Sequence, residues 1–124
     1  MNKKIESFTD LFAWQKAHQL VLSIYKVTKS FPSDEIYGLT NQIRRASISI
    51  TSNIAEGFSR KSQAEKKQFY YISIGSLTEV QNQLLISKDI GYLQKNLFKD
   101  IAEQTVLVSK LVNSLIKNIN KLNS

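Results

Sequence analysis

Few residues in this chain have the types and spacing that catalysis requires. The 124 residues include no cysteine, which excludes a thiol nucleophile, a disulfide and a Cys-ligated metal site. His18 is the single histidine, so a nucleophile–base arrangement would depend on it, and no acidic residue is close to it in sequence. The Glu-x-x-His pairs of a di-iron bundle and the spacing of a phosphate-binding loop are both missing. We therefore expect a non-enzymatic protein without cofactor or metal.

A row of polar side chains is the first pattern that indicates a site. Its members recur at steps of three and four residues, which places them on one flank of a helix: Gln42, Arg45, Ser49, Asn53 and Glu56. In the following helix Glu79 lies between Ile72 and Ile86 in a seven-residue row, and a half-buried carboxylate needs a partner. Arg45 is the candidate partner. The network either fixes helix register or a subunit contact, or it forms a polar pocket for a ligand or nucleic acid.

A basic cluster is the second pattern. It consists of Arg60, Lys61, Lys66 and Lys67, and Tyr70 and Tyr71 follow it. The whole chain has 17 Lys and Arg against 10 Asp and Glu, a net charge of +7. Cationic side chains neutralise phosphates, and exposed tyrosines stack on unpaired bases. The cluster is therefore a candidate RNA or DNA site; the alternative is an ordinary solvated first turn of a helix.

The elements that position these residues are four predicted helices. Apolar residues recur with helical period over about residues 10–30, 34–57, 62–90 and 94–122. Asp10 is a candidate N-cap, and Pro32 ends the first helix. Gly57 suits the left-handed residue that closes the second helix, and Gly91 stops the third. The sequence from Ser62 to Glu65 predicts a capping box.

Helices of similar length joined by short connections pack as antiparallel neighbours. We predict an all-α, up-down-up-down antiparallel four-helix bundle, formed by a single domain over residues 1–124. The alternative is an extended helical hairpin that completes its core by dimerising. Apolar residues of the third helix spread over more than half of its circumference, whereas one buried side needs a stripe of about 100°. We therefore expect its surplus apolar face to contact another subunit, and apolar surface on the first helix is the alternative contact.

The sequence gives no sign of a membrane or export segment. Its apolar runs fall short of the roughly 20 residues that span a bilayer. The residues after Met1 lack the apolar core of a signal peptide. We expect a cytoplasmic protein that does not bind membranes.

Several motifs together resemble one bacterial family. They are Phe12–Ala17, Phe31–Ala46, Ser49–Gly57 followed by Arg60, Gly75–Glu79 and Gly91–Leu93. In this order they resemble the four-helix bundle proteins encoded by intervening sequences within 23S ribosomal RNA genes. The resemblance covers nearly the whole chain, and the run from Gln42 to Gly57 is its most distinctive part. Ile74 departs from the pattern, which favours a smaller residue there, and this affects local packing.

The resemblance implies a homo-oligomeric bundle, most simply a pentameric ring. A related group comprises accessory proteins of diversity-generating retroelements, which work with a reverse transcriptase and RNA. That kinship implies binding of RNA or DNA through the basic surface. The alternative function is a protein-interaction scaffold that binds a protein partner and no nucleic acid, with the positive charge serving solubility.

Overall fold

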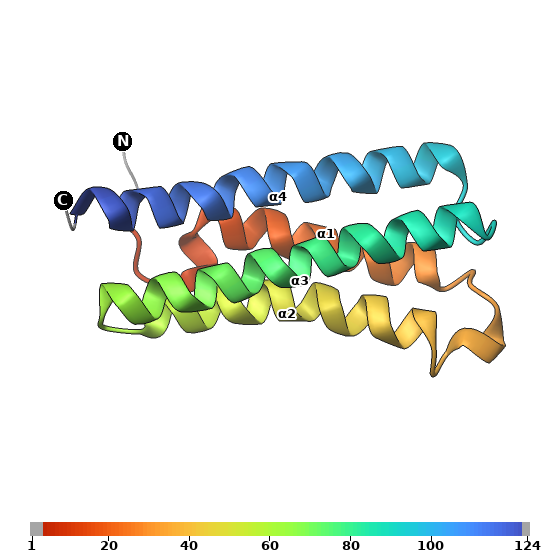
Figure 1. Ribbon diagram of the computed structural model, residues 1–124, viewed down its shortest axis with the longest axis horizontal. Coiled ribbons are helices and arrows are strands. Elements are labelled where there is room, and N and C mark those ends of the chain that lie inside the picture. Colours follow the sequence, from red (N-terminus) through yellow and green to blue (C-terminus); the bar gives the residue numbers. More distant parts are fainter. Residues whose placement is uncertain (1–3, 123–124) are drawn as a thin grey trace.

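Four α-helices run alternately up and down beside one another in the computed structural model, which describes residues 4–122 (Figure 1). They are α1 (Phe12–Thr28), α2 (Leu39–Ser59), α3 (Gln63–Asp89) and α4 (Lys95–Leu122), and two short 3-10 helices, η1 (Phe8–Asp10) and η2 (Ser33–Glu35), precede α1 and α2. Residues 4–122 contain no β-strand, so the predicted all-α fold with four helices is confirmed. None of these helices combines the length and the apolar character needed to cross a membrane.

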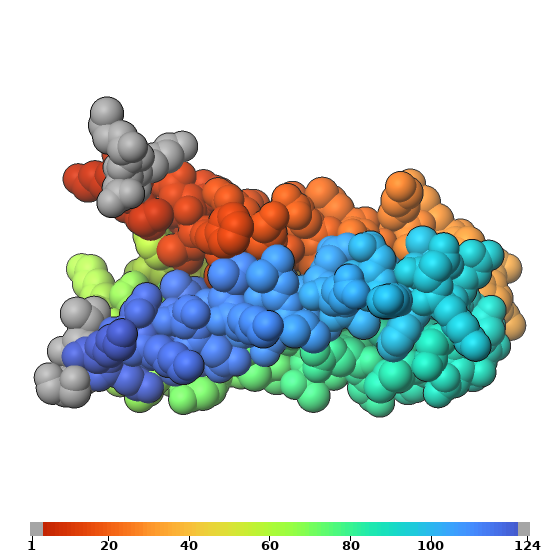
Figure 2. All heavy atoms as spheres, turned by 90° about the horizontal axis from the view of Figure 1, so that it is seen from above, coloured from red at the N-terminus to blue at the C-terminus, as the bar shows by residue number. Residues whose placement is uncertain are grey.

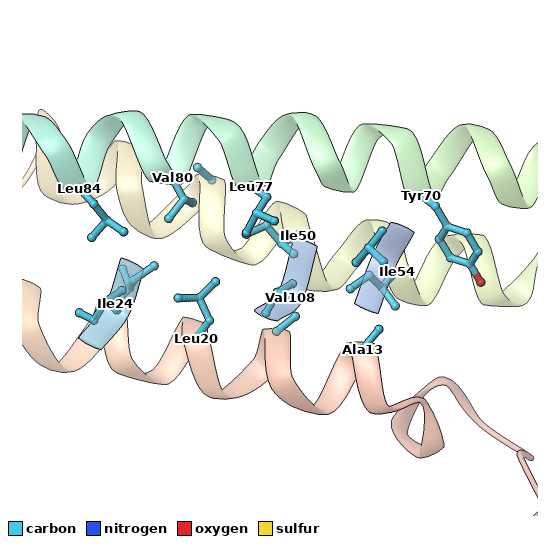
Figure 3. Packing of buried hydrophobic residues seen from close by; sticks show 14 of the residues in the cluster. Ala13, Leu20, Ile24, Ile50, Ile54, Tyr70, Leu77, Val80, Leu84 and Val108 are labelled. Atoms are coloured by element: carbon cyan, nitrogen blue, oxygen red, sulfur yellow. The ribbon is translucent and has the colours of Figure 1, made fainter. Parts of the chain in front are cut away.

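The core lies along the axis of the bundle, where each helix packs against two others. α1 and α3 both contact α2 and α4. In Figure 3, Leu77, Val80 and Leu84 of α3 point into the same interior as Leu20 and Ile24 of α1. Full burial of each such side chain stabilises the fold by about 1.5–3 kcal/mol. The predicted helical stripes therefore do form one continuous core.

The first helix begins later than predicted, because Asp10 caps a different turn. Its carboxylate accepts hydrogen bonds from the backbone N–H groups of Glu6 and Ser7 at 3.0 and 3.1 Å, which closes η1. Leu11 then adopts an extended conformation, and α1 starts after it without a side-chain cap. Asp10 as the N-cap of α1 was thus a wrong prediction.

The sequence pattern allows the second helix to begin anywhere from Ser33 to Leu39, and the structure has it begin at Leu39, because Glu35 belongs to η2 and caps α2 from there. Glu35 Oε1 accepts from the Leu39 N–H at 3.2 Å, and its Oε2 accepts from the Tyr92 hydroxyl at 2.9 Å. This hydrogen bond raises the pKa of Tyr92, with partial burial adding to the effect. One carboxylate therefore fixes the start of α2 and ties it to the α3–α4 connection. There Gly91, at φ +87°, ends α3 as predicted.

Gly57 does not close α2, which continues to Ser59; it lies inside the helix and is buried against the Tyr70 ring of α3. A Cβ at this position would lie 2.6 Å from Tyr70 Cε1 and 2.9 Å from Tyr70 Cδ1. Glycine is thus required here for close packing of two helices, not for a left-handed backbone. Ser62 Oγ accepts from the Glu65 N–H at 3.0 Å and so provides the first half of the predicted capping box.

α3 buries small polar residues against α2 while it exposes large apolar ones. Ser73 Oγ donates to the carbonyl of Ile50 at 3.0 Å, and Ser76 Oγ shares a hydrogen bond with Ser49 Oγ at 2.7 Å. Because serines are small, they allow the backbones of α2 and α3 to approach. In contrast, the apolar residues that α3 leaves exposed are Tyr71, Ile72, Leu85 and Ile86. The sequence-based prediction of surplus apolar surface on this helix therefore holds for the single chain.

Candidate functional site

The predicted polar row lies beside α3 and opens to solvent. Gln42, Arg45 and Ser49 of α2 line a groove of about 320 Å³ together with Ala46 and with Glu79 of α3. The structure thus brings together four of the six residues predicted for the polar network.

The pair predicted between Arg45 and Glu79, either buried or lining a subunit contact, is not buried within the single chain. Both side chains are exposed, and the residues described here include no ion pair between them within 4.0 Å. The reason is helical geometry: the next residues, Ala46 and Val80, take the buried positions, so the charged side chains point outward. Even if they met in solvent, such a pair would contribute only about 0–1 kcal/mol. A subunit-contact role for the two residues stays a prediction.

The remaining two residues of the polar row, Asn53 and Glu56, have different surroundings. Asn53 Nδ2 donates to Ser49 at both its carbonyl oxygen, 2.8 Å, and its Oγ, 3.1 Å. Through Ser49 this network reaches Ser76 of α3. Glu56 instead forms an exposed ion pair with Arg60 at 3.0 Å. Ser49 and Asn53 therefore serve the packing of α2 on α3.

The predicted basic cluster is largely engaged by its own chain. The Arg60 guanidinium pairs with Glu56 and lies 4.7 Å from the centre of the Phe69 ring. Lys66 Nζ donates to the carbonyls of Phe58 and Gly57 at 2.6 and 3.3 Å, so it caps the last turn of α2. Burial lowers the pKa of this ammonium group. Lys66 as a solvent-directed cation was thus a wrong prediction.

The remaining two lysines of the cluster differ. Lys67 Nζ donates to Asn120 Oδ1 at 2.9 Å, which links α3 to the end of α4. Lys61 is exposed in the turn between α2 and α3. A role for these four residues as one phosphate-binding patch stays a prediction, and the geometry favours Lys61 and Lys67 within it.

The two tyrosines behind the cluster separate into a core residue and a surface residue. Tyr70 is 4% exposed, and its burial raises the pKa of its hydroxyl. Tyr71 is 54% exposed. Only Tyr71 therefore has a ring face available for stacking in the single chain.

Tyr71 also lines a groove that the sequence analysis missed. The groove has a volume of about 620 Å³, lies between α3 and α4, and is called the basic groove below; its lining residues are Tyr71, Lys110, Asn113, Ser114, Ile116, Lys117 and Asn120. Figure 2 shows α4, in blue, exposed along its length with α3, in green, beside it. One signal was available in the sequence: no acidic residue follows Glu103, while Lys110, Lys117 and Lys121 recur at helical spacing.

A second open surface follows the outside of α3. We call it the α3 outer row and define it by Ile72, Gly75, Glu79 and Ile86. Ile72 and Ile86 are 45% and 41% exposed. A Cβ built on Gly75 would meet nothing within 4 Å, although glycine in a helix interior costs about 0.5–1 kcal/mol relative to alanine. Among residues 4–122 no contact requires glycine at position 75.

The residues considered for catalysis are not brought together. His18 is exposed and stacks on the Trp14 ring, with 4.7 Å between the ring centres. Over residues 4–122 no group of three or more histidine or acidic side chains is arranged to hold a metal ion.

Comparison with known proteins agrees with this architecture. The family model of the 23S rRNA-intervening sequence proteins matches residues 9–114. A crystal structure from Bacteroides thetaiotaomicron, of a protein with unknown function from the S23 ribosomal protein family, is similar with a TM-score of 0.78. The two chains are 22% identical, and the similarity covers 85% of this chain and 95% of the other, so it concerns the fold alone. No curated protein matches the chain.

Proposed function

Since the chain belongs to the 23S rRNA-intervening sequence protein family, we propose that it is a non-enzymatic, self-associating bundle that binds RNA or DNA through a basic surface. The basic groove is the observation that carries this proposal. It combines two lysines, amide side chains and an exposed aromatic ring on one surface. Phosphate groups and bases are the ligands for which that combination is suited.

The charge of the groove is not compensated nearby. In the part of the chain that the structure describes, neither Lys110 nor Lys117 has a carboxylate within 4.0 Å. Each phosphate that such a cation neutralises releases condensed counterions, so binding should weaken as salt rises. Lys66 and Arg60, by contrast, already have partners within the chain. The groove is therefore a better phosphate site than the cluster that the sequence first indicated.

The proposal is tested by a salt titration of RNA and DNA binding between about 50 and 300 mM salt. Replacing Lys110 and Lys117 together by Gln should lower the slope of log K against log salt by about 0.7 for each single-strand phosphate that is no longer neutralised, or by about 0.9 for duplex DNA. The matched control replaces Lys95 and Lys99, exposed residues at the start of α4, by Gln. This control removes the same charge and should leave the slope of log K against log salt close to that of the wild type. Failure of the folded wild-type protein to bind at 50 mM salt would contradict the proposal.

A protein-interaction scaffold is the second candidate function. Tyr37 is 92% exposed and its neighbour Ile36 is 47% exposed, in the connection between α1 and α2. Exposed aromatic and aliphatic side chains of this kind are frequent anchors in protein interfaces. A folded oligomer that binds no nucleic acid would favour this function.

Self-association is proposed through the α3 outer row. Two partly exposed isoleucines flank Gly75, where the surface offers room for a close helix contact. Burial of the two isoleucines of this row between copies would also give a reason for the glycine. A closed ring of five subunits is the assembly that the family resemblance implies.

A further inference from the structure

We propose that the basic groove selects single-stranded nucleic acid, with one unpaired base stacked on Tyr71. This inference rests on the proposed function and names the ligand class of that site. The observation that carries it is the place of Tyr71 between two hollows. Tyr71 borders the basic groove on the side of α4, and it also borders a shallower depression formed by Ala64, Lys67, Gln68 and Ile72 on α3.

Lysines therefore line both hollows beside the ring, and the Lys67 ammonium reaches Asn120 of the groove. Lys67 lies in the α3 depression, and Lys110 and Lys117 lie in the groove on the side of α4. Lys110 and Lys117 are two helical turns apart, about 10 Å along the axis at 1.5 Å per residue. A strand whose base stacks on Tyr71 can thus place phosphates near lysines before and after that base.

The exposed ring favours an unpaired base over a duplex. In a duplex both faces of each base are covered by stacking, so a side chain on a protein surface reaches only phosphates and base edges. Tyr71 is 54% exposed and shares a groove with two lysines. The ring can therefore add to binding only where a base is free to leave the stack.

Amide side chains complete the groove. Asn120 Oδ1 accepts from Lys67 Nζ at 2.9 Å, a hydrogen bond that does not use the two amide N–H donors of Asn120. Asn113 Nδ2 donates to the Ser109 carbonyl at 2.9 Å. One amide is thus positioned by α3 and the other by its own helix. They supply hydrogen bonds to base edges or sugars without a strong sequence preference, as in other single-strand sites.

The test compares a fluorescent single-stranded oligonucleotide with a duplex of the same length and composition, by anisotropy at 50 mM salt. The wild type should bind the single strand more tightly. Tyr71→Ser should weaken single-strand binding about 5- to 150-fold, the range for removal of one base–aromatic stack, and Tyr71→Phe should retain it. Tyr37→Ser is the matched control, because it makes the same change at an exposed tyrosine outside the groove.

Each outcome has a distinct meaning. Equal or tighter binding of the duplex, or unchanged affinity of Tyr71→Ser, would overturn this inference while salt-dependent binding still supports the proposed function. Absence of binding to either nucleic acid would overturn the proposed function itself. A Tyr71→Ser variant that changes the mass of the assembly, with no change in affinity, would place the ring in a subunit contact and overturn the inference. Circular dichroism of both serine variants checks that they are folded.

Discussion

Gly57→Ala should destabilise the protein by about 1–3 kcal/mol, although alanine is the better helix former. The added methyl group would lie 2.6 Å from Tyr70 Cε1 and 3.2 Å from the backbone carbonyl oxygen of Lys66. Neither neighbour is the mobile end of a flexible chain, because Tyr70 is in the core and Lys66 O belongs to α3. Either α2 and α3 must separate or the ring must move. Urea denaturation at one fixed chain concentration measures the change in the free energy of unfolding.

Gly75→Ala is the matched control for this substitution within the single chain. Since Gly75 lies in the proposed subunit contact, both variants are compared at a chain concentration low enough for the monomer. It is the same change in the middle of a helix, but the new Cβ meets nothing within 4 Å. It should therefore stabilise the single chain by about 0.5–1 kcal/mol. Combining Gly57→Ala with Tyr70→Leu should cost less than the sum of the two single changes, because the smaller side chain removes the clash. Equal stability of Gly57→Ala and wild type would show that the helices yield freely at this contact.

Replacing Ile72 and Ile86 together by Asp should convert the assembled protein into a folded monomer. Both side chains are more than 40% exposed in the single chain, so the substitutions leave its core intact. In an assembly they would bury two carboxylates in an apolar contact, which is strongly unfavourable without partners. Light scattering should give a multiple of 14.2 kDa for the wild type, five-fold for the ring that the family resemblance implies, and 14.2 kDa for the variant.

Leu22→Asp is the control for charge on an exposed apolar position. Leu22 is 56% exposed on α1, away from the α3 outer row, and its replacement should leave the mass unchanged. A wild-type mass of 14.2 kDa at tens of micromolar would contradict self-association. An oligomeric variant would instead place the subunit contact on another surface.

Periodicity alone was enough to predict the four helices and most of their buried faces. Ile43, Ile50 and Ile54 recur on one side of α2, and all three are fully buried. Gly91 was predictable as a helix stop, because its role is local: a left-handed residue directly after the last turn. Features that depend on one segment of backbone are thus the ones that the sequence reveals.

Features that depend on two segments were mispredicted or missed. The role of Gly57 depends on Tyr70 opposite, and the start of α2 depends on the Glu35 carboxylate, which Tyr92 also binds. Lys66 has the sequence pattern of a solvated cation, because nothing in its own helix shows that two α2 carbonyls lie within its reach. The lysines of α4 could be assigned to a groove only from the structure, in which Tyr71 of α3 lines the same groove. These contacts between residues of different helices arise only when the helices pack together.

The serine contacts between α2 and α3 also bear on the order in which the chain folds. Three residues, Arg60 to Ser62, join these helices, and closing so short a loop costs little conformational entropy. The contact of α1 with α4 instead joins the two ends of the described chain and requires the widest closure. The α2–α3 hairpin should therefore be structured in the folding transition state before α1 and α4 dock. If this order is correct, the kinetic φ-value is higher at Ser73 in α3 than at Val112 in α4. A higher φ-value at Val112 would contradict it.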